Sequence, residues 1–414
     1  MRKRLLMLAF ISLLLLAGCS NAMTKPSAKP QISEDYYGFI NYDLLQQKTI
    51  PATEGAWSYF YELNEKTSGL LQEIVTELAD DPGAYPMGSS EQKISDLYHC
   101  ATNLDLRNTQ GLAAIAPYLT QLDAAQTLDQ YLDALIALSD IGESSLIVYG
   151  FYPDDLDSDI MMVGFESMSD LQVAPITSGG GYLSNVVGLQ QATRQYEYDQ
   201  YKKGVDRQTW YITPQTINAY YNPTNNEICF PAAILQAPFY DAQSSRGKNL
   251  GGIGAIIAHE ISHAFDKTGS LYDEKGNYNI WWTEKEYQQY EALSQKIIDY
   301  YGNYTIFTGD PVNGTLTLSE NIADLGAVTA ITAVAKEEGA SLDDLYSNWA
   351  TIWANQTTPD QAKEHVINNT HAPAEIRANA VLSSMDGFYE CYDIKAGDQM
   401  YVAPENRVGI WQTK

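Results

Sequence analysis

Apolar residues recur at helical spacing along most of the first half of the chain. Leu70, Ile74 and Leu78 are four residues apart, which is the period of a helix with one apolar face. The same spacing continues through residues 91–140. The pattern therefore predicts a run of helices in this half.

Two short β-branched runs interrupt that pattern. Residues 146–152 and 160–165 flank an acidic turn, which favours a β-hairpin. Three consecutive glycines then follow within residues 178–181. Because glycine tolerates backbone conformations that other residues avoid, this stretch is the best internal boundary.

The second half of the chain carries clear helix-start signals. Thr283 and Glu286 form the S/T-x-x-E capping pattern, in which each side chain bonds to the other's backbone N–H. Ser341 opens a similar pattern, and Pro359 follows Thr358 at a position where proline starts helices. These signals predict helices beginning near residues 284, 342 and 359.

The N-terminus has the features of an export signal. Basic residues 2–4 precede an apolar run, residues 5–16, that is too short to span a membrane. The run ends in small residues before Cys19, as in bacterial lipoprotein signals, where the mature cysteine carries acyl chains. We expect residues 1–18 to be the signal peptide and 19–33 a tether. An ordinary signal peptide or an uncleaved anchor is the alternative.

Composition narrows the class of protein. A net charge of −27 argues against nucleic-acid binding, because few cations are present to neutralise phosphates. Cys100, Cys229 and Cys391 are widely spaced, so they form no metal knuckle and no disulfide framework. One disulfide is possible, but we expect buried free thiols.

One pentapeptide, residues 259–263, has the pattern of a metal-binding site. His259 and His263 are four residues apart, so on a helix both imidazoles point from one face and can reach one ion. Glu260 stands beside them, placed to act on a water molecule as general base. The alternatives are a chance match and a histidine pair with a structural role.

A catalytic zinc site takes three protein ligands. Glu320 and Asp324 are one helical turn apart in an otherwise apolar segment, where solvation poorly explains two carboxylates. Glu320 can complete the ligand set, and Asp324 can orient a ligating imidazole through its other ring nitrogen.

At these residues the chain resembles the neprilysin and endothelin-converting-enzyme family of zinc metallopeptidases, especially its bacterial oligopeptidase O branch. The matching segments are residues 218–221 (NAYY), 230–239 (FPAAILQAPF), 258–266 (AHEISHAFD), 320–326 (ENIADLG), 371–373 (HAP) with Arg377, and 401–411. The resemblance implies a mainly α fold with small β elements (α+β), made of a thermolysin-like zincin catalytic domain and a helical lid domain.

The resemblance also implies a role for each matching residue. One Zn²⁺ per chain is held by His259, His263 and Glu320, with Glu260 as general base and Asp324 as the carboxylate behind a ligating histidine. The remaining roles concern the substrate. His371 stabilises the oxyanion, Arg377 holds a substrate carbonyl, and Asn218 and Ala219 bind the peptide backbone as an added strand. Ile234, Phe239, Ile256 and Trp353 line the pocket for a bulky apolar residue after the cut.

The chain departs from the family chiefly in length. Residues 34–90 are expected to open the catalytic domain, 91–180 to be a remnant of the lid, and 181–414 to complete the catalytic domain. The middle of the lid is missing, which indicates either a compact variant with an open cleft or a degenerate or altered relative. Ala258 and Ala327 stand where the family commonly has glycine.

The sequence thus favours a monomeric zinc-dependent endopeptidase that cuts oligopeptides outside the cytoplasm, lipid-anchored to a bacterial cell membrane. Two other hypotheses remain open. One is a catalytically impaired zinc-binding lipoprotein that binds peptides or a partner. The other is an envelope solute-binding or adhesion lipoprotein with an incidental histidine motif.

Overall fold

The structure is a computed structural model that describes residues 28–81, 83–141, 150–164 and 181–411. The expected signal peptide, Cys19 and most of the tether lie outside these residues, as do residues 146–149 and 178–180 of the expected hairpin and boundary. No helix of the described part has the length and apolar character needed to cross a membrane.

The described chain divides into two compact units. The larger unit takes the described residues within Met1–Asn64, Ile212–Tyr272 and Ile280–Lys414, and the smaller unit those within Glu65–Tyr211 and Asp273–Asn279. Helix α3 (Tyr59–Asp80) begins in the larger unit and continues in the smaller unit.

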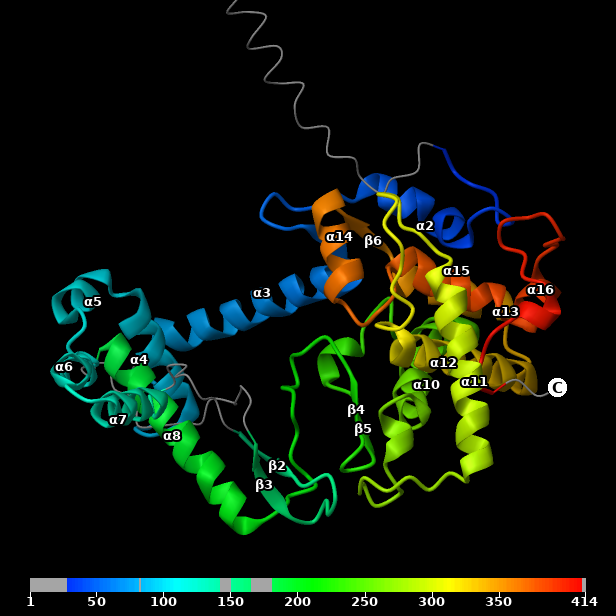
Figure 1. Cartoon of the computed structure of the whole chain (residues 1–414). Coiled ribbons are helices and arrows are strands. Elements are labelled where there is room, and N and C mark those ends of the chain that lie inside the picture. Colours follow the sequence, from blue (N-terminus) through cyan, green and yellow to red (C-terminus); the bar gives the residue numbers. More distant parts are fainter. Residues whose placement is uncertain (1–27, 82, 142–149, 165–180, 412–414) are drawn as a thin grey trace, which may run out of the picture. The chain divides into compact units, whose positions relative to one another are not determined.

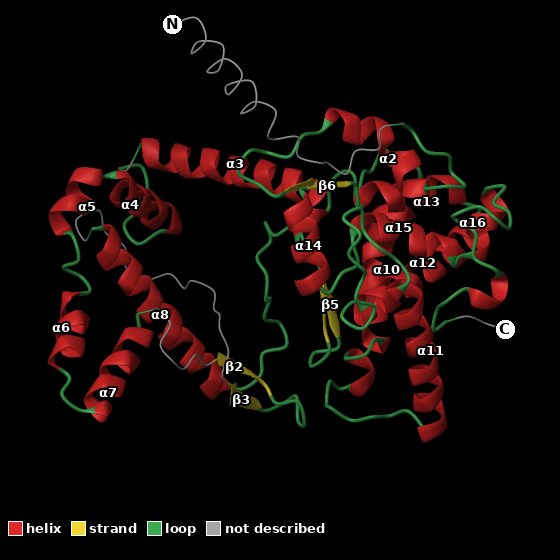
Figure 2. Cartoon of the chain, turned by 45° about the horizontal axis from the view of Figure 1, so that its top comes forward, coloured by secondary structure: helices red, strands yellow, loops and turns green. Residues whose placement is uncertain are grey.

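The larger unit is built mainly from helices (Figures 1 and 2). They are α2 (Tyr36–Gln47), α9 (Arg246–Asn249), α10 (Ala255–Ser262), α11 (Glu284–Gly302), α12 (Leu318–Glu338), α13 (Leu342–Ile352), α14 (Pro359–Asn368), α15 (Ala374–Ser383) and α16 (Asp386–Cys391). Two antiparallel pairs accompany them: β1 (Ala56–Ser58) with β6 (Asn355–Thr357), and β4 (Tyr220–Asn222) with β5 (Glu227–Cys229). The mainly α class with small β elements is confirmed.

The predicted helix starts are confirmed. Thr283 and Glu286 form the complete capping box of α11. The Ser341 hydroxyl accepts from the backbone N–H of Asp344 at the start of α13. Thr358 caps α14 in the same way, with Pro359 as its first residue. Local capping therefore sets where these three helices begin.

Helix α12 is the centre of the larger unit's core. Twelve of its residues are buried, and it packs against α10, α11 and α15. At Gly326 a β-carbon would lie 2.6 Å from Ser262 Oγ of α10, so only glycine allows these two helices to approach this closely. The helix with the histidine motif and the helix with Glu320 are thereby held side by side.

The smaller unit is also helical but thinly packed. It contains most of α3, the helices α4 (Ser90–Thr102), α5 (Leu104–Gln110), α6 (Ala116–Ala124), α7 (Leu128–Ser139) and α8 (Tyr182–Lys203), and the pair β2 (Gly150–Pro153) with β3 (Met161–Gly164). The predicted helices at 91–140 and the hairpin are confirmed where the chain is described. Helix α8 packs on α4, so residues after 180 still belong to this unit.

Segment 273–279 joins the smaller unit through polar contacts. Ser158 bonds to this segment twice: its backbone N–H donates to Asn277 Oδ1 at 2.9 Å and its hydroxyl to the Lys275 carbonyl at 2.8 Å. Arg207 donates to the same Lys275 carbonyl at 3.3 Å. Contacts this remote in sequence are not visible in any local pattern.

Candidate metal centre

Two imidazoles come from the end of α10. His259 lies in its last turn, and His263 caps its C-terminus and opens a short 3-10 turn. His259 and Glu260 are buried, at 5% and 6% exposure. The predicted buried helix is confirmed on this face, whereas Ile257 and Ile261 on the same helix are exposed.

Glu320 completes a compact triangle of donor atoms. His259 Nε2 lies 3.0 Å from His263 Nε2 and 3.3 Å from Glu320 Oε2, and His263 Nε2 lies 3.6 Å from the same oxygen. Zinc takes nitrogen and oxygen ligands at about 2.0–2.2 Å, which at tetrahedral angles places ligand atoms about 3.3–3.4 Å apart. The three predicted ligands are therefore spaced to share one such ion.

Hydrogen bonds behind the imidazoles aim their free nitrogens inward. His259 Nδ1 donates to Asp324 Oδ1 at 2.8 Å, and His263 Nδ1 donates to Asp266 Oδ2 at 2.7 Å. Both Nε2 atoms of the neutral rings then present lone pairs to each other. A separation of 3.0 Å between them requires a cation in between, either a proton or a metal ion.

The surroundings of Glu320 Oε2 also indicate a cation at this site. This oxygen is buried and has no partner with hydrogen-bond geometry among the described residues, although three imidazole nitrogens lie within 3.6 Å. A buried carboxylate oxygen without a donor is costly. The donor set fits a divalent ion such as zinc.

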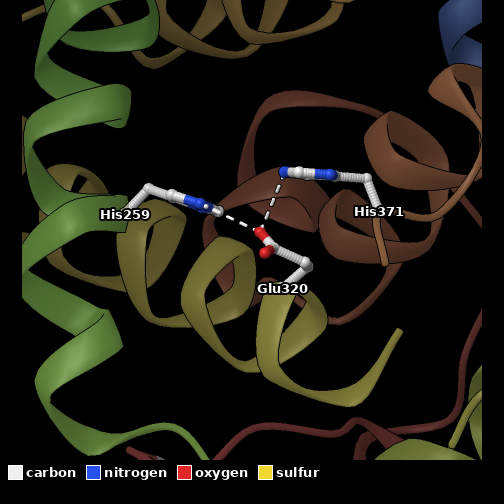
Figure 3. A group of neighbouring side chains, drawn as sticks. All are labelled: His259, Glu320 and His371. Carbon is white, nitrogen blue, oxygen red and sulfur yellow. Dashed lines mark ion pairs between the residues drawn. The ribbon is translucent and has the colours of Figure 1, made fainter. Parts of the chain in front are cut away.

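His371 approaches the same carboxylate from the opposite side. Its Nε2 lies 3.0 Å from Glu320 Oε2, and Figure 3 shows Glu320 between His259 and His371. Donor atoms of these three residues lie within 4.8 Å of one another, so a ligand set with His371 in place of His263 is also geometrically open. We favour His263, because its ring is held by Asp266 and is less exposed than that of His371.

Asp266 is a functional candidate that the sequence analysis did not single out. Its Oδ1 accepts from the backbone N–H groups of Thr268 and Gly269 at 2.7 and 2.8 Å, while Oδ2 holds His263. A carboxylate behind a ligating histidine fixes its tautomer and orientation. The H-x-x-D spacing from His263 was the available signal.

Asp324 is held in turn by Arg377. The guanidinium donates to it from Nε at 2.6 Å and from Nη2 at 2.9 Å, and stacks 3.6 Å over the Trp353 ring. Arg377 was expected to hold a substrate carbonyl. Here two of its nitrogens are engaged with Asp324, and the side chain also lines the cleft described below.

Electrostatics follow from this packing. Burial lowers the pKa of His259, but the hydrogen bond and charge of Asp324 and the contact with Glu320 outweigh it and raise that pKa to about 9. Burial raises the pKa of Glu320, but the nearby imidazoles of His259 and His371 outweigh burial and hold the pKa of Glu320 well below its usual range. Burial also raises the pKa of Glu260, with opposing contributions from His259 and His263.

A cleft of about 640 Å³ opens onto these residues, and every residue that lines it belongs to the larger unit. Of the predicted site residues it is lined by Asn218, Ile234, Ile256, His259, Glu260, Trp353, His371 and Arg377. The predicted site residues that do not line it are His263, Glu320, Asp324, Ala219 and Phe239. Asn218 and Ala219 directly precede strand β4.

The apolar part of the cleft contains one aromatic residue that the sequence analysis missed. Phe60 stacks on Trp353 with ring centroids 5.8 Å apart and meets the fully buried Phe239 edge-on at 4.8 Å. Phe239 thus supports the cleft through Phe60. The aromatic cluster at residues 57–61 was the signal, but nothing local linked it to Trp353.

Comparisons with known proteins agree with the fold and the motif. The profile of peptidase family M13 matches residues 218–408, and the profile of its N-terminal part matches residues 32–198. A neutral endopeptidase of Lactococcus lactis is 38% identical over 260 residues, which is 62% of this chain and 41% of the relative. Endothelin-converting enzyme 1 of Homo sapiens is 37% identical over 227 residues, covering 51% and 29%.

Solved structures show the same fold. A zinc metalloprotease of Mycobacterium tuberculosis, solved in complex with an inhibitor, aligns over 94% of this chain and 99% of its own with a TM-score of 0.83 at 19% identity. PepO of Lactobacillus rhamnosis aligns over 92% and 100% with a TM-score of 0.79, also at 19% identity.

The class of protein defined here is a mostly helical, zincin-type peptidase fold with a histidine–glutamate cluster. The chain belongs to peptidase family M13, the family of neprilysin and endothelin-converting enzymes. Its match spans less than half the length of the curated relatives.

Proposed function

We propose that the protein is a zinc-dependent endopeptidase that hydrolyses oligopeptides. The observation that carries this proposal is the triangle of His259, His263 and Glu320, with a buried carboxylate oxygen facing imidazole nitrogens. Membership of a peptidase family and the similarity to neutral endopeptidases support the same reaction.

In this proposal His259, His263 and Glu320 hold one zinc ion, and Asp324 and Asp266 orient the two imidazoles. The chemistry that zinc supplies at such a site is Lewis-acid polarisation of a carbonyl and a lowered pKa of water. Glu260 lines the cleft beside His259. It takes the proton of the attacking water and returns it to the leaving amine.

His371 is proposed to stabilise the oxyanion, and its hydrogen bonds to Asn369 support this role by orienting the ring. The backbone N–H of His371 donates to Asn369 Oδ1 at 2.8 Å, which identifies that atom as the amide oxygen. The ring Nδ1 lies 3.1 Å from the same oxygen, so Nδ1 donates to it. This bond orients the ring, whose Nε2 lies 3.0 Å from Glu320 Oε2.

The substrate is proposed to bind as an extended strand along Asn218 and Ala219, next to β4. The residue after the cut would enter the apolar part of the cleft lined by Ile234, Ile256, Trp353 and Phe60, with Phe239 behind it. These side chains favour a bulky apolar residue. Arg377 is proposed to hold a substrate carbonyl while it anchors Asp324.

The proposal also covers the location of the enzyme and its oligomeric state. The lipoprotein-like sequence around Cys19 supports a lipid-anchored, extracytoplasmic peptidase at a bacterial membrane, working as a monomer. Residues 91–180 are proposed to be a shortened lid, and the short match to curated relatives agrees with this. The rival function is a catalytically impaired zinc lipoprotein that binds peptides or a partner.

A peptide-library digestion read by mass spectrometry tests the proposal. The zinc-loaded full chain should cut peptides before bulky apolar residues, and both a chelator and Glu260→Gln should stop cleavage. Equal product from wild type and Glu260→Gln would reject the peptidase. Peptide binding without any turnover would instead support the rival function.

A further inference from the structure

We propose that Glu375 makes the cleft select peptides with a lysine or arginine side chain beyond the apolar pocket. This inference rests on the proposed peptidase function and names its substrate class more narrowly. It concerns a carboxylate in the cleft that neither the metal cluster nor the proposed reaction uses.

Glu375 lies at the start of α15, just after the loop that carries His371. It lines the same cleft as the apolar pocket, together with Tyr37 and Asn355. The Tyr37 hydroxyl accepts from the backbone N–H of Asn355 at 2.8 Å and also lies 3.5 Å from the Trp353 carbonyl. Because Glu375, Tyr37 and Trp353 line the same cleft, a peptide bound in that cleft is offered both the apolar pocket and the carboxylate.

Among the described residues, no hydrogen bond or ion pair reaches the side chain of Glu375. Arg377 is the only lysine or arginine that lines the cleft, and its guanidinium is committed to Asp324. Glu54 also lines the cleft and adds a second negative charge.

Glu375 is an exposed residue that lines the cleft, so a ligand in the cleft can reach its carboxylate. Desolvation by neighbouring protein atoms, with a smaller contribution from Asp35, raises the pKa of Glu375 to about 7. Asp35 itself accepts from Asn379 and from the backbone N–H of Gly38. An ammonium or guanidinium group entering the cleft would give Glu375 a partner that the described residues do not supply.

A structural explanation must be distinguished from this one. Glu375 lies in the first turn of α15, where the helix dipole favours a carboxylate. That role predicts an effect on stability alone. It does not predict that the charge of the peptide matters, so a binding preference separates the two explanations.

The test compares peptides that differ by one charge. Each peptide has a bulky apolar residue followed by three positions, and lysine or its uncharged analogue norleucine is placed at each position in turn. Binding is measured by calorimetry on the zinc-loaded full chain, with Glu260→Gln in every variant to prevent turnover. Cleavage by the chain with Glu260 intact is measured separately, so a failure of the peptidase proposal is seen independently of the binding result.

At one position we expect lysine to bind about 10- to 100-fold more tightly than norleucine, the range of a hydrogen bond to a charged group. Glu375→Gln should remove this preference. The matched control Glu337→Gln, an exposed glutamate of α12 outside the cleft, should retain it. Equal binding of both peptides at every position, or a lysine preference that persists in Glu375→Gln, would overturn the inference.

A measurement without substitution guards against a misfolded variant. The lysine preference of the chain with Glu375 in place should shrink as salt is raised from low to high concentration, because salt screens a charge pair in an open cleft. A preference that does not change with salt would contradict recognition by a carboxylate.

Discussion

The two units are built from similar helices but differ in what those helices bury. In the larger unit, α12 and α13 are surrounded by side chains, and Trp349, Tyr346 and Ile322 are fully buried. In the smaller unit the clustered core is Leu189 with two half-buried neighbours. Apolar residues on its helices, such as Leu70 and Leu128, are exposed.

This contrast shows that helical periodicity alone does not imply a packed core. Both units carry capped helices, but the large cluster of buried side chains lies in the larger unit. The cleft and the candidate metal centre lie wholly in that unit. Precise placement of catalytic groups requires side chains locked by packing, which is the property that the smaller unit lacks.

The largest predicted effect is a loss of catalytic activity without a loss of stability. Glu260→Gln should lower kcat/KM by about 10²–10⁴-fold, because it removes the proposed general base while keeping its shape. Zinc content and the unfolding of both units should be unchanged. Steady-state kinetics, metal analysis and denaturation measure the three quantities. A variant that loses zinc would show that Glu260 acts structurally.

Core truncation should affect the larger unit alone. Trp349→Ala should lower its free energy of unfolding by about 3–5 kcal/mol, because the indole is fully buried. Hydrogen exchange in α12 should accelerate, while exchange in α4 and α7 should not change. If α4 and α7 lose protection together with α12, the two units unfold as one and the comparison fails.

Removing the Asp266 carboxylate should weaken zinc binding while the other residues of the site stay in place. Asp266→Ala should reduce zinc affinity by about 10- to 100-fold, the usual effect of losing a carboxylate behind a ligating histidine. Competition with a chromophoric chelator gives the affinity. Asp241→Ala, an exposed aspartate of the same unit, is the control, and equal affinities for the two variants would refute the role of Asp266.

The pH dependence of the metal-free protein should distinguish the units in another way. The pKa of His259 is about 9 in the folded chain against 6.5 as its ordinary value. Its protonation therefore stabilises the larger unit fully below about pH 6.5, and this contribution is lost as pH rises towards 9. Because a ligating imidazole must be neutral, zinc affinity should rise over the same interval.

Chelated protein denatured at several pH values tests this expectation, with hydrogen exchange assigning unfolding to each unit. The larger unit should lose stability from pH 6.5 to 9. A larger unit whose stability is constant or increases across this interval would show that no cation-sharing histidine pair exists.

The smallest effect should come from the exposed apolar residues of the smaller unit. Leu132 on α7 is 38% exposed, so Leu132→Ser should change the stability of this unit by only about 0.5 kcal/mol. Hydrogen exchange in α7 provides the measurement. A loss as large as that of Trp349→Ala would mean that the smaller unit has a better-packed core than its exposed leucines indicate.

The sequence by itself determined the features that arise within one or two helical turns. Thr283 with Glu286, Ser341 and Thr358 start their helices because each cap bonds to a backbone group three residues away or less. His259 with His263 and Glu320 with Asp324 share helix faces because of the 3.6-residue period. The H-x-x-D link from His263 to Asp266 was equally local and could have been found.

Only the tertiary structure decided which of these local pieces meet. Gly326 lets α12 approach α10 so that Glu320 reaches both imidazoles, and Phe60 meets Trp353 across most of the chain. The boundaries of the two units and the unpaired state of Glu375 are likewise set by packing. Such contacts join segments far apart in sequence, so they depend on the combined shape of many side chains and leave no period or spacing in the sequence.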